Sequence, residues 1–286
     1  MTLSVLIAEP WADYGLVDCG HGRKLERYGP YRFIRPEPQA MWAPAAPDWQ
    51  ADGEFVGGSD EEGGGRWRLS DKVPQSWPLA WRDVRFHAAN TPFRHLGFFP
   101  DMAPQWDWMR ERSGPDREVL NLFGYTGVGS LALAATGARV THVDASKKAV
   151  EAAKANQRLS GMGERPIRWL VDDALKFVQR EVRRGKRYDG IILDPPKYGR
   201  GPGGEVWHLE EGLPELIAAC RQLLDAQSAF LVLTVYAIRM SALAIGELMR
   251  QQVADLGGTV ECGDMATREE TRGLLLPTAI FARWSR

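Results

Sequence analysis

A glycine-rich turn and an acid that follows it are the residues of this sequence best suited to hold a cofactor. Gly124, Gly127 and Gly129 stand in the segment NLFGYTGVGS, between an apolar run typical of a strand and a predicted helix. Glycine at such a turn lets the backbone approach a ligand closely. Asp144 ends the next predicted strand, where its carboxylate can accept hydrogen bonds from the two hydroxyls of a ribose. The pattern predicts a nucleoside-containing cofactor; the alternative is a tight turn followed by a helix-capping acid.

A rigid acidic turn, DPPKY, follows the predicted strand YDGIIL and is a second candidate for chemistry. Because proline fixes φ, Pro195 and Pro196 would hold the Asp194 carboxylate toward a reacting group. The carboxylate could then accept a hydrogen bond from an N–H of that group. The alternative for Asp194 is a simple turn acid. Lys197 and Tyr198 come next, either as substrate contacts or as exposed loop residues.

Strands that alternate with helices must position these residues. Beyond residue 112, apolar runs of strand length alternate with amphipathic helical patterns, which predicts a mostly parallel sheet covered on both faces. Two strands without a helix between them, in GGTVECGDM and LLLPTAIFARW, are expected to pair antiparallel at one edge. Residues 1–112 hold eight of the eleven tryptophans among frequent proline and glycine, which indicates short strands. We therefore predict a β-rich N-terminal domain over 1–112 and an α/β domain over 113–286.

The glycine spacing, G-x-x-G-x-G, differs from the dinucleotide fingerprint G-x-G-x-x-G and resembles the first motif of class I S-adenosylmethionine-dependent methyltransferases. The resemblance implies S-adenosylmethionine as cofactor and a Rossmann-like α/β fold with a seven-stranded sheet whose terminal strand is antiparallel. A nicotinamide dehydrogenase is disfavoured by the same spacing. The cofactor-binding positions that the resemblance implies are Phe123, Gly124, Tyr125, Thr126, Gly127 and Gly129 in the glycine turn, Asp144, Ala145 and Ser146 at the ribose, and Asp172, Asp173 and Ala174 at the adenine.

NLFGYTG and DPPK also resemble the N-x-F-x-Y-T-G and D-P-P-K motifs of bacterial ribosomal large-subunit RNA methyltransferases, which modify a base carbon or ring nitrogen. GFFPDMAPQW, residues 97–106, resembles a segment that lines their cofactor pocket and adds Phe99 and Asp101 to the cofactor-binding candidates. The resemblance covers about residues 85–286. It implies a ribosomal RNA substrate, with Asp194, Pro195, Pro196, Lys197 and Tyr198 facing the acceptor. Two features depart from that family: there is no room for the RNA-binding module that many members carry at the extreme N-terminus, and a cysteine is missing.

The three cysteines, Cys19, Cys220 and Cys262, bear on which atom is methylated. Methylation of carbon 5 of a pyrimidine usually needs a cysteine thiolate that adds to carbon 6 of the ring. None of the three follows the fourth or the fifth predicted strand, and Cys220 fits a buried position of an amphipathic helix. We therefore expect a nitrogen acceptor, or an oxygen, rather than the cysteine-dependent route. Their odd number and wide spacing also predict free thiols and no structural metal.

Residues 21–35, HGRKLERYGPYRFIR, interleave cations with aromatic residues, as single-stranded RNA binding requires. The alternative is an ordinary charged hairpin whose aromatic side chains pack inward. A further cation follows the DPPKY turn in a glycine-rich loop. The candidate RNA-binding residues are Arg23, Lys24, Arg27, Arg32, Arg35 and Arg200.

The composition limits the possible partners. A net charge of -1 gives no overall attraction to nucleic acid, so an RNA must be held by a local surface. The apolar runs are too short to span a bilayer and no signal peptide is evident, which predicts no membrane partner and a cytoplasmic location. The oligomeric state stays open. An RNA methyltransferase is the first hypothesis; a methyltransferase of the same fold acting on a small molecule or protein, or a non-catalytic RNA-binding module, is the alternative.

Overall fold

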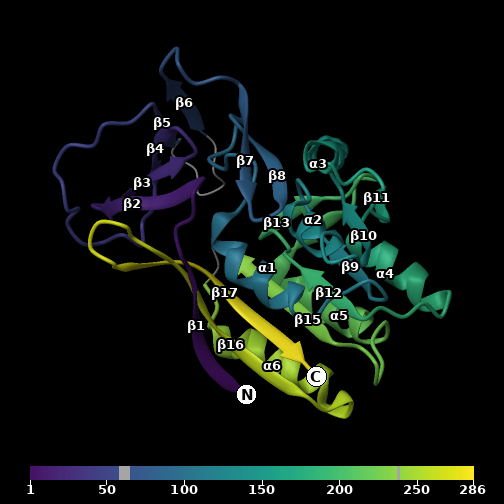
Figure 1. Ribbon diagram of the computed structural model, residues 1–286. Coiled ribbons are helices and arrows are strands. Elements are labelled where there is room, and N and C mark those ends of the chain that lie inside the picture. The colour runs from purple at the N-terminus through teal and green to yellow at the C-terminus, as the bar shows by residue number, and fades with distance from the viewer. Residues whose placement is uncertain (58–64, 237–238) are drawn as a thin grey trace. The chain divides into compact units, whose positions relative to one another are not determined.

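The computed structural model describes residues 1–57, 65–236 and 239–286, and the chain divides into two compact units (Figure 1). The first unit comprises Met1–Leu6, Pro104–Met265 and Thr278–Arg286. The second comprises Ile7–Ala103 and Ala266–Pro277. Each unit joins segments that are far apart in the sequence, whereas the sequence pattern suggests one boundary, between residues 112 and 113.

A mixed sheet of eight strands, in the order β1-β16-β17-β15-β12-β9-β10-β11, forms the centre of the first unit. The strands from β15 to β11 in this order run parallel to one another, and β17 runs antiparallel to β15. The predicted α/β class with an antiparallel terminal strand is confirmed. The sheet has one strand more than predicted, because β1 lies beyond the expected pair β16 and β17. The strands are β1 (Thr2–Ala8), β9 (Glu118–Leu122), β10 (Arg139–Asp144), β11 (Ile167–Val171), β12 (Gly190–Leu193), β15 (Phe230–Tyr236), β16 (Thr259–Arg268) and β17 (Leu275–Ser285).

Helices pack on both faces of this sheet, as neighbouring residues of β15 show. Leu231 and Leu233 lie in a core cluster with residues of α4, α5 and α6, whereas the ring of Phe230 lies 6.0 Å from that of Trp108 in α1. Successive residues of a strand point to opposite faces, so α1 lies on the other side from α4 to α6. None of the described helices is long and apolar enough to cross a membrane. The helices are α1 (Ala103–Arg110), α2 (Val128–Ala134), α3 (Lys147–Leu159), α4 (Ala174–Arg183), α5 (Leu209–Arg221) and α6 (Ala242–Gln252), with short 3-10 turns η1 (Pro100–Met102) and η2 (Ala254–Leu256).

The second unit is built from strands, which confirms the predicted β-rich N-terminal region. Its five-stranded sheet has the order β2-β3-β4-β5-β6, and β7 pairs with β8 separately. The predicted hairpin in RKLERYGPYRFIRP forms β3 and β4, and Gly29 supplies a positive φ of 62° at the turn between them. The strands are β2 (Tyr14–Gly20), β3 (Arg23–Tyr28), β4 (Tyr31–Pro36), β5 (Gly53–Gly57), β6 (Gly65–Leu69), β7 (Ser76–Trp81) and β8 (Val84–Ala89).

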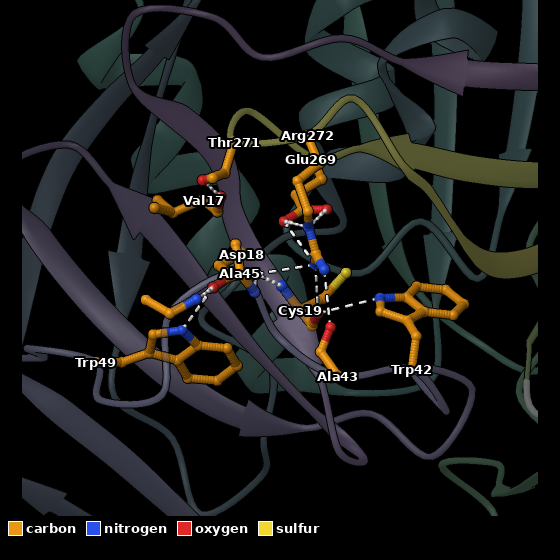
Figure 2. A network of polar contacts seen from close by, with 11 residues as sticks. Val17, Asp18, Cys19, Trp42, Ala43, Ala45, Trp49, Glu269, Thr271 and Arg272 are labelled. Atoms are coloured by element: carbon orange, nitrogen blue, oxygen red, sulfur yellow. Dashed lines mark hydrogen bonds and ion pairs between the residues drawn. The ribbon is translucent and has the colours of Figure 1, made fainter.

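A polar network around Asp18 joins three segments of the second unit (Figure 2). The Asp18 carboxylate, only 3% exposed, accepts hydrogen bonds from Ala45 N–H and Ala46 N–H at 3.0 Å each and from the Trp49 indole at 2.8 Å. Arg272 donates to the same carboxylate at 3.0 Å. The network thus ties β2 to the loop that carries Trp49 and to the turn between β16 and β17.

Asp18→Ala is expected to lower the free energy of unfolding by about 3 kcal/mol. The substitution removes one of the two carboxylates that pair with Arg272, the other being Glu269. It also leaves the backbone N–H groups of Cys19, Ala45 and Ala46 without their acceptor. Urea denaturation measures the loss. Asp18→Asn, which keeps the shape and one acceptor, should cost less, and an unchanged free energy of unfolding in Asp18→Ala would contradict the role of the network.

The same carboxylate predicts a pH dependence. Burial raises the pKa of Asp18, but the hydrogen bonds from Ala45, Ala46 and Trp49 outweigh it, so the pKa falls from 3.8 to about 2. Because this folded-state pKa lies below the unfolded value, the contribution to stability is complete above about pH 4 and is lost as the pH falls toward about 2. Denaturation at several pH values should show a loss of about 2 kcal/mol from this group, and a smaller pH effect in Asp18→Asn.

Candidate functional site

The register of the parallel strands brings the ends of four strands to one edge of the sheet. Leu122 of β9 is paired with Val143 of β10 and with Leu193 of β12. Asp144, the last residue of β10, is paired with Val171, the last residue of β11. Ligands of open α/β sheets bind at the carboxyl ends of the strands, so this edge is the candidate site.

Four predicted segments meet at this edge. Phe123 follows β9, Asp144 ends β10, Asp172 follows β11 and Asp194 follows β12. Neighbouring strands lie about 4.8 Å apart, so the segments are adjacent to one another. The structure therefore brings together the glycine turn, the predicted ribose acid, the acid pair and the DPPKY turn.

Asp144 is held in place by two backbone N–H groups. Its Oδ2 accepts from Tyr125 N–H at 2.9 Å and its Oδ1 accepts from Ser146 N–H at 2.8 Å. A carboxylate oxygen can accept more than one hydrogen bond, so both oxygens retain capacity for the two hydroxyls of a ribose. Burial raises the pKa of Asp144, and the two N–H groups offset part of that effect. The carboxylate fits a ribose. Ala145 follows it, and Ser146 Oγ caps α3 by accepting from Ala149 N–H.

The glycine turn has an unusual backbone conformation. Phe123 and Tyr125 have φ values of 57° and 49°, in the left-handed region that residues other than glycine rarely adopt. Gly127 has a φ of 81°. A Cβ on Gly124 would lie 2.3 Å from the ring of His142. Glycine at position 124 is therefore required for the backbone to pass so close to β10.

Three buried, uncharged side chains lie next to the glycine turn and are hydrogen-bonded to one another. His142 Nδ1 and Ser130 Oγ lie 2.9 Å apart, and Asn121 Nδ2 donates to Ser130 Oγ at 2.9 Å. Burial lowers the pKa of His142 to about 3, so the imidazole is neutral near pH 7. The N-x-F-x-Y-T-G motif includes Asn121 but gave it no role, and the sequence pattern did not single out Ser130 or His142, because one serine or one histidine carries no recognisable spacing.

The rest of the glycine turn is held by neighbouring side chains. Thr126 O accepts from Asn156 Nδ2 of α3 at 2.9 Å. A Cβ on Gly129 would lie 3.4 Å from Trp106 Nε1 of α1, which is an ordinary contact distance, so the structure does not require glycine at this position.

Asp172 and Asp173, the two acids that follow β11, make different contacts. Asp173 Oδ1 accepts from Lys176 N–H at 2.9 Å and caps α4, which begins at the buried Ala174. Asp172 accepts from Asp173 N–H at 2.9 Å and forms an ion pair with Arg180. Asp173 therefore has a structural use, and Asp172 is the better candidate for contacting an adenine.

A short hairpin follows Asp194, formed by β13 (Tyr198–Arg200) and β14 (Val206–His208). Lys197, Tyr198 and Arg200 are exposed, and the rings of Tyr198 and His208 lie 5.2 Å apart. The exposure leaves these predicted substrate-facing side chains accessible from solvent.

Trp207 links the DPPKY turn to the glycine turn. Its Nε1 donates to Pro196 O at 2.7 Å, and its ring lies 5.4 Å from that of Phe123. Pro195, between Asp194 and Pro196, is buried. The tryptophan fixes both turns at once, and no sequence motif marked it.

Phe99 and Asp101, the remaining cofactor candidates, belong to the second unit. The Phe99 ring lies 4.6 Å from that of His95, and Asp101 lies in η1 with 5% of its surface exposed. Their role at the cofactor stays a prediction.

Arg35 requires a correction to the predicted RNA-binding patch. It is 6% exposed, and its Nε and Nη2 donate to Glu26 at 2.6 Å and 2.7 Å. It is therefore not available to an RNA phosphate. Tyr28 and Phe33 are fully buried beside it, so the inward-packed alternative is correct for these three residues.

The other cations of the patch differ in availability. Lys24 forms an ion pair with Glu37 at 3.2 Å, and Arg27 forms one with Glu270 at 3.0 Å. Arg23 and Arg32 are exposed.

All three thiols are buried. Burial raises the pKa of Cys19 to about 11 and raises the pKa of Cys220 and Cys262 as well. Cys220 lies in the core between α5 and the sheet, as predicted. In the part of the chain that the structure describes, no group of three or more His, Cys, Asp or Glu side chains could hold a metal ion.

The chain matches a family model described as S-adenosylmethionine-dependent methyltransferase over residues 60–229, more than half of its length. A solved structure, the SAM-dependent methyltransferase from Agrobacterium tumefaciens, is 46% identical with a TM-score of 0.95 and covers 100% of this chain and 94% of that chain. SMU.776, a putative methyltransferase solved in complex with SAH, shares 16% identity with a TM-score of 0.69 over 92% of this chain and 71% of that one, which shows the fold alone.

Curated relatives match a part of the chain. The ribosomal RNA large subunit methyltransferase I of Tolumonas auensis is 35% identical over 150 residues, 50% of this chain and 35% of that protein. The protein of the same name from Erwinia tasmaniensis is 28% identical over 158 residues, 55% of this chain and 37% of that protein. The chain therefore aligns with little more than a third of the length of these relatives.

Asp144→Ala is expected to weaken the binding of S-adenosylhomocysteine at least about 100-fold, since it removes a charged acceptor for two ribose hydroxyls. Titration calorimetry measures the affinity. Asp116→Ala, at an exposed acid ahead of β9, is the matched control and should bind like the wild type. Wild-type affinity in Asp144→Ala, or tight binding of NAD, would contradict the assignment of the site.

Proposed function

The chain belongs to the family of S-adenosylmethionine-dependent methyltransferases, and on that basis we propose that it methylates a nitrogen atom of a base in ribosomal RNA. The curated relatives, which are named as ribosomal RNA methyltransferases, support the substrate. A cytoplasmic location, where ribosomal RNA is found, goes with this proposal.

The residues at the sheet edge fit the cofactor. S-adenosylmethionine, when bound, supplies an electrophilic methyl group on a sulfonium sulfur. Asp144 would accept the ribose hydroxyls, the backbone of residues 123–129 would hold the methionine part, and Asp172 would meet the adenine amino group. The fit rests on the free acceptor capacity of Asp144 and on the close backbone approach at Gly124.

The observation that carries the proposal is the position of Asp194 beside the glycine turn. Leu193 and Leu122 are paired, so Asp194 and Phe123 start neighbouring turns at the same level of the sheet. The Asp194 carboxylate accepts an N–H of the acceptor base, which leaves the nitrogen lone pair directed at the methyl group. In-line displacement depends mainly on such positioning, and Pro195 with the Trp207 bond to Pro196 O keeps the turn rigid.

Buried thiols support nitrogen over carbon 5 as the acceptor. The covalent route needs a thiolate within reach of the pyrimidine ring. Cys19, Cys220 and Cys262 are all buried, and burial raises the pKa of each thiol, which favours the protonated form.

One observation favours a second candidate, a small molecule or protein as substrate. That alternative expects residues 21–35 to be packed against the protein itself, and Tyr28, Phe33 and Arg35 are. The two candidates differ in where a labelled methyl group appears.

Asp194→Ala is expected to slow methyl transfer to an unmodified large-subunit ribosomal RNA transcript about 100-fold or more, with S-adenosylhomocysteine affinity unchanged, because the acceptor is no longer oriented. Labelled methyl transfer followed by nucleoside mass spectrometry measures rate and product. Asp194→Asn, which keeps the shape and one acceptor, should retain more activity than Asp194→Ala.

Three outcomes would overturn parts of this proposal. Labelled small molecule or protein without labelled RNA would favour the second candidate. A product of 5-methylcytosine would refute the nitrogen acceptor. Full activity in Asp194→Ala would remove this residue from the site.

A further inference from the structure

The register of the second unit's sheet places arginines of two strands on one face. Arg68 of β6 is paired with Glu54 of β5, which is paired with Ile34 of β4. Side-by-side residues share a face of a sheet, and so do residues two apart in one strand. Arg66 therefore lies on the same face as Arg68, and Arg32 on the same face as Ile34.

A third strand adds Arg23. Pro36, two residues after Ile34, is paired with Arg23 of β3. Strands lie about 4.8 Å apart, so the cations from β3 to β6 extend over about 14 Å of the sheet. Arg23, Arg32, Arg66 and Arg68 together are called the arginine face below.

The opposite face of this sheet carries packed aromatic side chains. Phe33, Phe55 and Trp67 point to it, with ring-centroid distances of 5.5 Å between Phe33 and Trp67 and 5.2 Å between Phe55 and Trp67. Arg35, two residues after Phe33, shares that buried side. The predicted patch is thus divided by strand alternation, and its exposed part continues onto β6.

The guanidinium groups of the arginine face are available. All four arginines are exposed. Among the residues that the structure describes, Arg23, Arg32 and Arg66 form no ion pair, and Arg68 meets only Glu54, at 3.9 Å. Arg23 also lies 5.5 Å from the centre of the Trp49 ring, which adds an aromatic surface.

We propose that the arginine face binds the phosphate backbone of the RNA substrate, an inference that rests on the proposed function. Guanidinium groups donate paired hydrogen bonds to phosphate oxygens and stay charged at any physiological pH. With a net charge of -1 for the whole chain, a local surface of this kind must supply the attraction. The face has four arginines against two acids, Glu54 and Asp52, which stands two residues before Glu54 and accepts a hydrogen bond from Arg32 N–H at 2.9 Å.

The double variant Arg66→Gln with Arg68→Gln tests the face. Fluorescence anisotropy with the unmodified large-subunit ribosomal RNA transcript should show about 10-fold weaker binding and a slope of log affinity against log salt that is smaller by about 1.5. Arg66→Lys with Arg68→Lys keeps both charges and should retain the slope. S-adenosylhomocysteine affinity should be unchanged in both.

Arg158→Gln with Arg165→Gln is the matched control. Arg158 lies in the last turn of α3 and Arg165 in the loop that follows it, so these exposed arginines are at the opposite edge of the main sheet from the strand ends that carry Asp144. The control removes the same charge and should bind the transcript like the wild type. An equal loss in the control, or no loss in the Arg66 and Arg68 variant, would refute the arginine face.

The connection between β5 and β6 offers a second measurement. Asp60, Glu61 and Glu62 stand there in the sequence, outside the described residues. Changing all three to their amides should strengthen transcript binding at least about two-fold if phosphates approach β6, because it removes three negative charges that immediately precede β6 in the sequence and would repel phosphate. Weaker binding would count against the proposal.

These results separate the inference from the proposed function. Methylation of the transcript with wild-type affinity in the Arg66 and Arg68 variant refutes the arginine face alone. Methyl transfer only to a small molecule, with transcript binding that still depends on this pair, refutes the proposed substrate and retains the arginine face. Absence of any transcript binding by the wild type refutes both.

Discussion

The strands β12, β9 and β10 end side by side in the sheet, and the candidate site depends on this alignment. Leu193, Leu122 and Val143 are paired across these strands, so the turns that follow them begin side by side. Backbone hydrogen bonds between the strands fix where each strand ends relative to its neighbours. The sheet itself therefore positions the turns that carry the site residues. The Asp144 carboxylate then fastens the glycine turn to α3 through two backbone N–H groups. The residue assigned to the ribose is therefore also a structural part of the turn.

The packing beneath the glycine turn explains how its backbone conformation is kept. A left-handed conformation at a residue other than glycine costs of order 1 kcal/mol, and the turn has two of them, at Phe123 and Tyr125. The His142 ring fills the space that a side chain at Gly124 would occupy. Because His142 is neutral, this support adds no buried charge that would need a partner. The Phe123 ring packs against the Trp207 ring, so the side chain of this strained residue contributes to the packing of the site.

The features of the fold that depend on short stretches of sequence could be predicted. The alternation of strands and helices, the antiparallel β17 and the strand-end position of Asp144 follow from the hydrophobic periodicity and from the glycines and prolines that separate the elements. β1 was missed because its pairing with β16 joins residues more than two hundred and fifty positions apart, as the Ser4 bond to Glu261 does. His142 and Trp207 were missed because their contacts exist only in three dimensions. Arg35 was misjudged although a signal existed: it stands two residues after the apolar Phe33, on the same side of its strand.

The long sequence separations also bear on how the chain acquires its fold. In the first unit Ser4 contacts Glu261, and in the second Asp18 contacts Arg272. The first contact must wait until the ribosome has made residue 261 and the second until it has made residue 272, so co-translational folding can complete neither unit early. During that time β1, with the apolar side chains of Leu3 and Val5, has no strand to join. Until β16 has been synthesised, β1 therefore remains an unpaired strand whose backbone groups are open to pairing with another chain.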